Sequence, residues 1–441
     1  MGDAGEEALF ELLRIPSVSA LPEYAAEVQR ARDWVAGRLD GLGFTVELGP
    51  GGVISAEWMG RPGARVLGLY GHYDVQPPDP LDEWETPPFE PSVRDGYVYA
   101  RGATDNKGQL MACMRAVELA MANGGPPLNI RFLIEGEEEI GGRSLPEFVR
   151  ANADRLPTDH ICVIDGYFPA RGMPSLVTAL RGLLYVDIEA RGPSHDLHSG
   201  IFGGVAPNPF NSLAHILSEL KGRDGRVTIP GFYDRVRAPT AEEVEGWNKL
   251  AFSDEGELRS VTGARVLEGE AEFSPIERIW ARPTLDVHGV QGGFQGEGQK
   301  TVIPARALGK VSMRLVPDQD PEEILASLRR YVADLATPGV ETSVEPVSYT
   351  KPVEFGTDTP ATAAAKRAFA DAFGAEPVLA REGGSVPVTV ELQEALGAQM
   401  IVSGFGLPDD RLHSPNERMS LDQFHRGTQF TSRLMEILGG G

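Results

Sequence analysis

The chain has 441 residues, of which 41 are basic and 64 acidic, so its formal net charge at pH 7 is −23. An acidic surface repels phosphates, which argues against nucleic acid or an anionic membrane as a partner. No apolar run approaches the roughly 20 residues that span a bilayer, and the start, Met1 to Glu7, lacks the features of a signal peptide. Only two cysteines occur, Cys113 and Cys162, both in apolar contexts where we expect buried thiols. We therefore expect a cytoplasmic protein with one or two core-forming domains.

The first part of the chain alternates helix-like and strand-like segments. Apolar residues at three-to-four spacing predict a helix from Tyr24 to Leu42, ended by Gly43. The predicted strands that follow are 45–48, 53–59, 65–70, 129–134 and 160–164, and the predicted helices are 109–123 and one beginning at Ser144. This alternation is typical of α/β proteins and predicts a central mixed sheet with helices on both faces.

The pattern changes near Leu180 and returns after Pro352. Between these points, two alternating, half-buried strands and two amphipathic helices predict an α+β layer. The strands are 183–191 and 306–315, and the helices are 208–221 and 321–335. We therefore predict that an α/β domain, residues 1–177 and 351–441, is interrupted by an inserted α+β domain, residues 178–350.

An apolar run ends in Gly71-His72-Tyr73-Asp74, which predicts a buried strand with two polar side chains at its end. With period-two alternation, His72 and Asp74 lie on one side of the chain and Tyr73 on the other. Imidazole is a common metal ligand, and a carboxylate on its second ring nitrogen fixes its tautomer. Alone, such a pair is more often an ordinary polar turn, so the interpretation depends on further ligands.

Four further sites follow apolar segments. Asp105 precedes a predicted helix, where the alternative role is that of an N-cap. Glu135 to Glu139 places four carboxylates in five positions at a strand end. A bound cation would offset their repulsion, and the alternative is a solvated acidic loop. Asp165 ends another strand, and His413 lies in a loop after a strand at Gln399. Five strand-end sites with oxygen and nitrogen ligands suit a two-metal hydrolytic centre.

The motifs at these sites resemble those of the di-zinc metallopeptidases that include carnosine dipeptidases, acetylornithine deacetylase and succinyl-diaminopimelate desuccinylase. They occur in that family's order and are spread over most of the chain. The motifs are His72-Tyr-Asp-Val-Gln-Pro, Arg101-Gly-Ala-Thr-Asp-Asn-Lys-Gly, Glu135-Gly-Glu-Glu-Glu-Ile-Gly, Asp165 and Leu412-His-Ser-Pro-Asn-Glu. The resemblance implies a zinc-exopeptidase-like catalytic domain and an inserted lid through which the protein forms a homodimer.

The resemblance also implies the cofactor, which is two divalent metal ions per chain. One ion is expected on His72 and Asp165 and the second on Glu139 and His413, with Asp105 bridging both. Zinc is the expected metal, and the residue types also permit manganese or cobalt.

Two more roles follow from the resemblance. Glu138 becomes the general base and Asp74 orients His72. Adjacent residues of an extended segment point opposite ways, so Glu138 and Glu139 can serve water and metal separately only if the loop bends. Asn106 departs from the family, which often has a second Asp there. Asn keeps the hydrogen bonding but lacks the charge, and we do not expect it to abolish activity.

Four residues outside the metal motifs are expected to contact the substrate. His198 lies in a Gly-rich segment that resembles the one whose His stabilises the oxyanion from the partner subunit. Thr301 and Arg314 resemble elements that hold a substrate's C-terminal carboxylate, which Arg grips through two hydrogen bonds. Ser385 lies in a turn before a helix whose N–H groups could bind a carboxylate. The alternatives are a surface histidine, an ion-paired surface Arg and a simple helix start.

The long insertion at 230–247 and the stretch 285–314 resemble the dipeptidase branch. We therefore expect hydrolysis of dipeptides or short peptides with a free C-terminal carboxylate. The alternative is an N-acyl amino acid deacylase of the acetylornithine or succinyl-diaminopimelate type. A more remote alternative is a homologue that binds metal or ligand without catalysis.

Overall fold

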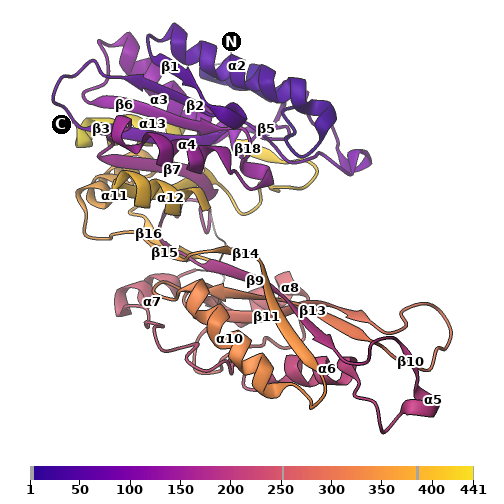
Figure 1. The fold of residues 1–441 in the computed structure, drawn as a ribbon. Coiled ribbons are helices and arrows are strands. Elements are labelled where there is room, and N and C mark those ends of the chain that lie inside the picture. Colours follow the sequence, from indigo (N-terminus) through magenta and orange to yellow (C-terminus); the bar gives the residue numbers. More distant parts are fainter. Residues whose placement is uncertain (1–3, 251–252, 384–386, 441) are drawn as a thin grey trace. The chain divides into compact units, whose positions relative to one another are not determined.

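The computed structural model describes residues 4–250, 253–383 and 387–440, and the chain folds into two compact units (Figure 1). Unit 1 comprises Met1–Thr178, Phe355–Ala380 and Val386–Gly441, and unit 2 comprises Ala179–Glu354 and Arg381–Ser385. Unit 2 is thus an insertion into unit 1, with a short additional segment from the last part of the chain.

Unit 1 is built on a six-stranded mixed sheet. Its strands are β1 (Thr45–Leu48), β2 (Ile54–Trp58), β3 (Val66–His72), β6 (Asn129–Glu135), β7 (His160–Tyr167) and β17 (Gln399–Gly406), in the order β1-β2-β6-β3-β7-β17. Strands β6, β3, β7 and β17 run parallel to one another. Strand β2 runs antiparallel to both of its neighbours, β1 and β6. Every residue of β3 and β6 is buried, as expected of strands covered by helices on both faces.

The helices of unit 1 pack in two groups. They are α1 (Ala4–Leu13), α2 (Ala25–Gly41), α3 (Lys107–Ala122), α4 (Ser144–Asn152), α11 (Pro360–Phe373), α12 (Pro387–Leu396) and α13 (Leu421–Leu438). Residues of α1, α2, α3, α11 and α13 share one hydrophobic core with the sheet, and α4 packs against α12. The α/β prediction is confirmed. No helix in the described part of the chain is long and apolar enough to cross a membrane, and both cysteines are buried and unpaired.

A small sheet links two distant segments of unit 1. It consists of β4 (Ser92–Arg94), β5 (Tyr97–Tyr99) and β18 (Arg418–Ser420), with β5 in the centre. Tyr99 lies opposite Arg418, so the loop that follows β5 and the loop that precedes β18 are brought together.

Unit 2 is a sheet with helices on one face. The sheet has the order β11-β13-β9-β14 and is antiparallel throughout, with β9 (Gly182–Arg191), β11 (Thr284–Gly292), β13 (Arg306–Leu315) and β14 (Glu341–Thr350). The alternating residues of β9 are buried against α6 (Pro209–Glu219) and α10 (Pro321–Leu335), which confirms the predicted α+β layer. The smaller elements are β10 (Leu197–His198), α5 (Ser199–Phe202), α7 (Ala241–Trp247), α8 (Glu255–Thr262), α9 (Pro275–Trp280) and β12 (Val302–Ile303). At the unit boundaries, β8 (Ser175–Leu180), β15 (Val353–Glu354) and β16 (Val378–Glu382) form a three-stranded sheet.

Candidate metal centre

The predicted metal ligands of unit 1 lie at one edge of the central sheet. His72 is the last residue of β3 and lies opposite Glu135, the last residue of β6. Because parallel strands end at the same edge, this is where an α/β sheet binds its ligands. Asp165 lies two residues before the end of β7, which is longer than predicted. Next to it, an added Cβ on Gly404 of β17 would lie 1.9 Å from the Gly166 carbonyl oxygen, so glycine permits the close approach of these strands.

Asp105 is placed between the two histidines. Its Oδ1 lies 3.2 Å from Nε2 of His72, and its Oδ2 lies 2.8 Å from Nε2 of His413. His72 Nε2 is also 3.4 Å from Asp165 Oδ1, and His413 Nε2 is 3.5 Å from Glu139 Oε2. The result is two groups of three ligand atoms that share one carboxylate, with the atoms of each group within 4.8 Å of one another.

These donor sets fit divalent metal ions. Each group offers one imidazole nitrogen and two carboxylate oxygens, a set that Zn²⁺, Mn²⁺ or Co²⁺ accepts. Burial raises the pKa of Glu139 to about 8. A hydrogen bond to Asp105 raises the pKa of His413 to about 9. Burial opposes ionisation of Asp105 too, yet hydrogen bonds from His413 and His72 keep its pKa below the usual range. Glu139 and His413 therefore bind protons more tightly than usual, because the site holds several carboxylates close together. Two bound cations would supply the positive charge that these protons provide.

Asp74 supports the centre without joining either group. It is buried, and its Oδ1 lies 3.3 Å from Nδ1 of His72, the ring nitrogen opposite the metal side, which also hydrogen-bonds the backbone carbonyl of Asp74 at 3.1 Å. Its Oδ2 accepts hydrogen bonds from the Ser19 hydroxyl at 2.7 Å and from the backbone N–H of Glu139 at 3.1 Å. One carboxylate thus orients residues of both metal groups.

The Glu138-Glu139 segment bends. Glu138–Ile140 forms a 3₁₀ turn, which ends at Gly141 in a left-handed conformation with φ 94°. The bend frees Glu138 from the strand alternation, so that Glu139 joins the metal group and Glu138 stays outside it. Burial raises the pKa of Glu138 to about 7, and the nearby acids add to this rise.

Asn106 contacts His72 and Asp165, the two residues that form one metal group together with Asp105. Its amide nitrogen donates to Asp165 Oδ1 and to the Ile164 carbonyl, both at 2.7 Å, and its Oδ1 accepts from the His72 backbone N–H at 3.3 Å. Although it occupies the N-cap position of α3, its side chain makes no capping bond. Asp105 is therefore not the N-cap, and the alternative role is wrong.

Sequence reasoning missed a role for Glu417. This fully buried carboxylate accepts hydrogen bonds from the backbone N–H groups of Gly102, Thr104 and Asp105, each at 3.0 Å, and from Arg101 at 2.8 Å. Glu417 therefore holds the loop that carries the shared ligand. The available signal was its position four residues after His413, but an acidic loop residue is ordinarily exposed.

The loop around His413 is itself strained. His413 has φ 57°, and Arg411 and Asn416 also have positive φ. Asn416 anchors this loop by accepting from the Glu85 N–H and donating to the Glu83 carbonyl, both at 2.8 Å. Such conformations in non-glycine residues cluster at functional sites, where surrounding contacts hold them.

The other predicted residues belong to unit 2 and fall into two places. His198 and Thr301 are neighbours, since β10 pairs with β12 and the Ser199 N–H donates to the Thr301 carbonyl. His198 is exposed, and its Nδ1 accepts from the Gly200 N–H at 2.9 Å. Arg314 lies near the far end of β13. Ser385 lies outside the described residues.

The two places are separated by the length of β13, because β12 precedes the start of this strand and Arg314 lies near its end. Arg306 starts β13 beside Arg191, and Arg314 lies eight residues on, beside Leu183. At about 3.3 Å per residue this is a separation of roughly 26 Å. A fully extended dipeptide spans only about 7 Å. One substrate therefore cannot contact Arg314 and the His198 end of the same chain.

Comparison with known proteins identifies the family. The model of peptidase family M20/M25/M40 matches residues 68–437, which is most of the chain. The chain belongs to this family. Its relatives include the Cys-Gly metallodipeptidase of Schizosaccharomyces pombe, which is 32% identical over 95% of this chain and 92% of the relative. Human Beta-Ala-His dipeptidase is 33% identical over 96% of this chain and 87% of its own length.

Solved structures agree with this assignment. The M20 family metallo-carboxypeptidase Sso-CP2 of Sulfolobus solfataricus has a TM-score of 0.84 and 30% identity, and the match covers 99% of this chain and 100% of that one. The dipeptidase Dug1p of Saccharomyces cerevisiae has a TM-score of 0.78 and 29% identity, over 99% and 96%. The resemblance seen in the motifs is thereby confirmed.

Proposed function

We propose that this M20 peptidase hydrolyses dipeptides and other short peptides with a free C-terminal carboxylate, in a reaction that depends on two divalent metal ions. The observation that carries the proposal is Asp105, whose two oxygens each face a different histidine-carboxylate pair. The dipeptidase relatives support the substrate class.

Glu138 and Asp74 have separate roles in the proposed hydrolysis. When bound, the two ions polarise the scissile carbonyl and lower the pKa of a water molecule. Glu138, near the ligands but outside both groups, takes a proton from the attacking water and delivers it to the departing amine. A base with a pKa near neutrality suits both transfers, and burial moves Glu138 in that direction. Asp74 holds His72 in one orientation.

Replacement of the base tests this division. Glu138→Gln should lower kcat by a factor on the order of 10² to 10⁴, while the number of bound metal ions stays close to two per chain. Glu137→Gln is a matched control, because Glu137 is the neighbouring carboxylate and belongs to neither metal group. Near-normal turnover in Glu138→Gln would remove Glu138 from this role.

We infer that Arg314 binds the C-terminal carboxylate of the substrate, with help from Ser385. A guanidinium binds a carboxylate through two parallel hydrogen bonds. Peptides whose C-terminus is amidated should therefore have a raised KM with the wild type. In Arg314→Gln the acid and amide forms should be equally poor. A panel of dipeptides and acetyl- or succinyl-amino acids decides between this proposal and a deacylase, for which only the acyl amino acids would turn over.

We further propose that the protein acts as a homodimer in which His198 and Thr301 of one copy serve the metal centre of the other. The separation of roughly 26 Å along β13 supports this, because one chain cannot bring its own His198 end and its own Arg314 to one substrate. His198 then donates a hydrogen bond to the oxyanion that forms during attack, a contribution of about 3 kcal/mol.

Mixing two inactive variants tests whether His198 acts at the metal centre of the other copy. In a hybrid of Glu138→Gln and His198→Ala chains, one of the two sites has both residues intact only if His198 acts across the dimer. Random reassociation should then restore about a quarter of the wild-type activity. If the mixture stays inactive although hybrids form, His198 acts within its own chain or not at all.

A further inference from the structure

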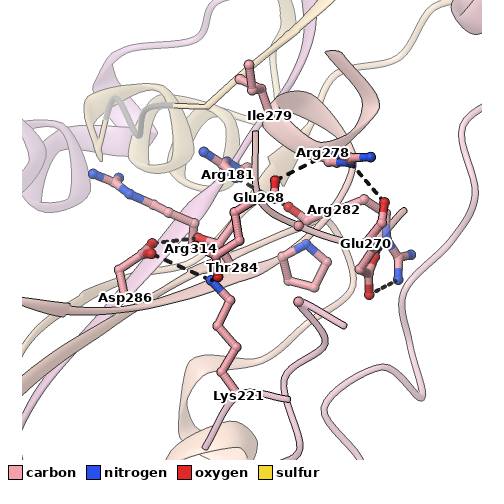
Figure 2. Close-up of a pocket in the computed structure, with 13 residues that line it drawn as sticks. Arg181, Lys221, Glu268, Glu270, Arg278, Ile279, Arg282, Thr284, Asp286 and Arg314 are labelled. Atoms are coloured by element: carbon pink, nitrogen blue, oxygen red, sulfur yellow. Dashed lines mark hydrogen bonds and ion pairs between the residues drawn. The ribbon is translucent and has the colours of Figure 1, made fainter. Parts of the chain in front are cut away.

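Unit 2 contains a charged pocket beside Arg314 (Figure 2). Its volume is about 410 Å³, and all of its lining residues belong to unit 2. Five lining residues are cationic and three are acidic: Arg181, Lys221, Arg278, Arg282 and Arg314, against Glu268, Glu270 and Asp286. An excess of positive charge is the opposite of the chain's net charge of −23, so it marks the pocket as distinct from the general surface.

The three acidic groups form ion pairs with two of the cations, Arg282 and Lys221. Arg282 forms a buried ion pair with Glu270, with Nη2 3.0 Å from Oε1 and a second contact through Nε. Lys221 Nζ lies 3.3 Å from Glu268 and 4.0 Å from Asp286, both of which have exposed side chains. The lining as a whole therefore keeps an excess of two positive charges.

Arg181 and Arg278 are held by backbone carbonyls. Arg181 donates from Nε to the Gly383 carbonyl at 3.1 Å and from Nη1 to the Arg282 carbonyl at 3.3 Å. Arg278 donates to the carbonyls of Glu270 and Phe273 at 2.8 and 2.9 Å. Neutral carbonyls fix a guanidinium in one orientation without cancelling its charge, so these groups are positioned for an anion.

Arg181 and Arg314 act on each other. In Figure 2 their guanidinium groups point to the same side, while Lys221 reaches Asp286 from the other. Burial and then the charge of Arg314 lower the pKa of Arg181 to about 10, and Asp286 opposes this change. Two neighbouring like charges in a half-buried position repel, and a bound anion relieves the repulsion.

We propose that this pocket binds small molecules that carry two carboxylates. A dianion brings the lining charges to neutrality, whereas a single carboxylate leaves one positive charge uncompensated. If the proposed function holds, on which this extension rests, the preferred substrates are peptides with a C-terminal Asp or Glu. Arg314 then binds the main-chain carboxylate and Arg181 the side-chain carboxylate, each through charge-assisted hydrogen bonds.

Binding is tested on the full-length protein after chelation, because carboxylates also bind divalent metals. The probes are glutarate, which has two carboxylates, and glutaramate, in which an amide of the same shape replaces one of them. Calorimetry should show that glutarate binds about tenfold or more tightly than glutaramate, and that rising salt weakens the binding. Equal binding of the two probes, or no binding of glutarate, overturns the proposal.

Three variants locate the site. Arg181→Gln should abolish the preference for glutarate. Lys310→Gln is the matched control, since Lys310 lies on β13 and pairs with Asp187 at 3.2 Å but does not line the pocket. Asp286→Asn removes a competing carboxylate and should strengthen glutarate binding several-fold. A purely structural role of Arg181 does not produce this gain, so Asp286→Asn decides even if Arg181→Gln does not fold. Unchanged affinity in Asp286→Asn overturns the proposed location.

Hydrolysis of Ala-Glu and Ala-Gln tests the extension to peptides. The KM for Ala-Glu should be about tenfold lower than for Ala-Gln, and Arg181→Gln should bring the two values together. Equal KM values in the wild type contradict the extension. If neither peptide is hydrolysed with metal present, the proposed function fails instead, and the glutarate measurement still decides on the pocket.

Discussion

The buried carboxylate of Glu417 offers the sharpest test of how the metal centre is held. Its Oε1 accepts from the N–H groups of Thr104 and Asp105, and its Oε2 from Gly102 and Arg101. In Glu417→Gln one oxygen becomes an NH₂ group. Either orientation turns this donor toward two other donors, so at least two of the four hydrogen bonds are lost.

The expected cost follows from the kind of bond. A buried hydrogen bond to a charged group contributes about 1.5–3 kcal/mol, so losing two costs about 3–6 kcal/mol in the free energy of unfolding. Breaking the buried pair with Arg101 alone would cost about 3–5 kcal/mol, which is the same range. Since whole proteins are stable by only about 5–15 kcal/mol, unit 1 should be severely weakened.

Denaturant unfolding of the chelated protein measures this cost, and tryptophan fluorescence is a suitable signal because Arg101 lies over the ring of Trp84. The control is Glu85→Gln, an exposed carboxylate paired with Arg94, for which a change within about 0.5 kcal/mol is expected. Because Asp105 belongs to both metal groups, Glu417→Gln should also weaken both metal sites together. A variant with wild-type stability and metal affinity would refute the assigned role.

Three further predictions address the metals, their support and a buried acid. Chelation should abolish peptide hydrolysis, and zinc, cobalt or manganese should restore it at close to two ions per chain; activity that survives complete removal of metal contradicts the proposed function. Asp74→Ala should lower kcat more than metal content, because Asp74 orients His72 and the Glu139 backbone but belongs to neither metal group; loss of both metals with turnover unchanged per bound metal would contradict this. Burial raises the pKa of Asp410 to about 7, so the folded state binds its proton more tightly than the unfolded state does. The contribution of Asp410 to stability should therefore fall as pH rises from about 4 to about 7, by up to about 4 kcal/mol. Asp410→Asn keeps the acceptor for Leu407 and should flatten this slope in unfolding curves measured across that range; an unchanged slope would show that Asp410 is not its source.

Much of the fold could be predicted from the sequence because its signals are local. Strand β13 and helix α10 have the predicted bounds, since their apolar periodicity is regular and Asp320 and Pro321 mark the helix start. Strand β14 was not predicted, because most of its residues are exposed and its pattern does not alternate. The predicted cytoplasmic location stays a prediction.

The site could be predicted only as far as motifs reach. The motifs predict that five strand-end sites lie at one edge of the sheet. They do not show that the chain turns at Glu138, which lets Glu138 and Glu139 take separate positions. Nor do they show that Glu417 is buried or that Arg181 is held beside Arg314, because both depend on contacts between segments far apart in the sequence. Burial of a charged residue depends on tertiary structure, which local patterns do not encode.

The length of β13 constrains the mechanism more than any single residue does. His198 and Arg314 both belong to unit 2: His198 lies in the two-stranded sheet β10-β12, which precedes the start of β13, and Arg314 lies near the end of β13. A rigid-body motion of unit 2 moves both residues together and leaves roughly 26 Å between them. Hinge closure therefore cannot bring His198 to a substrate whose carboxylate is bound by Arg314 of the same chain. If both residues are needed for one turnover, the second must come from another copy. Loss of activity on dilution to monomers should then accompany intact metal binding, since the metal groups lie wholly within unit 1.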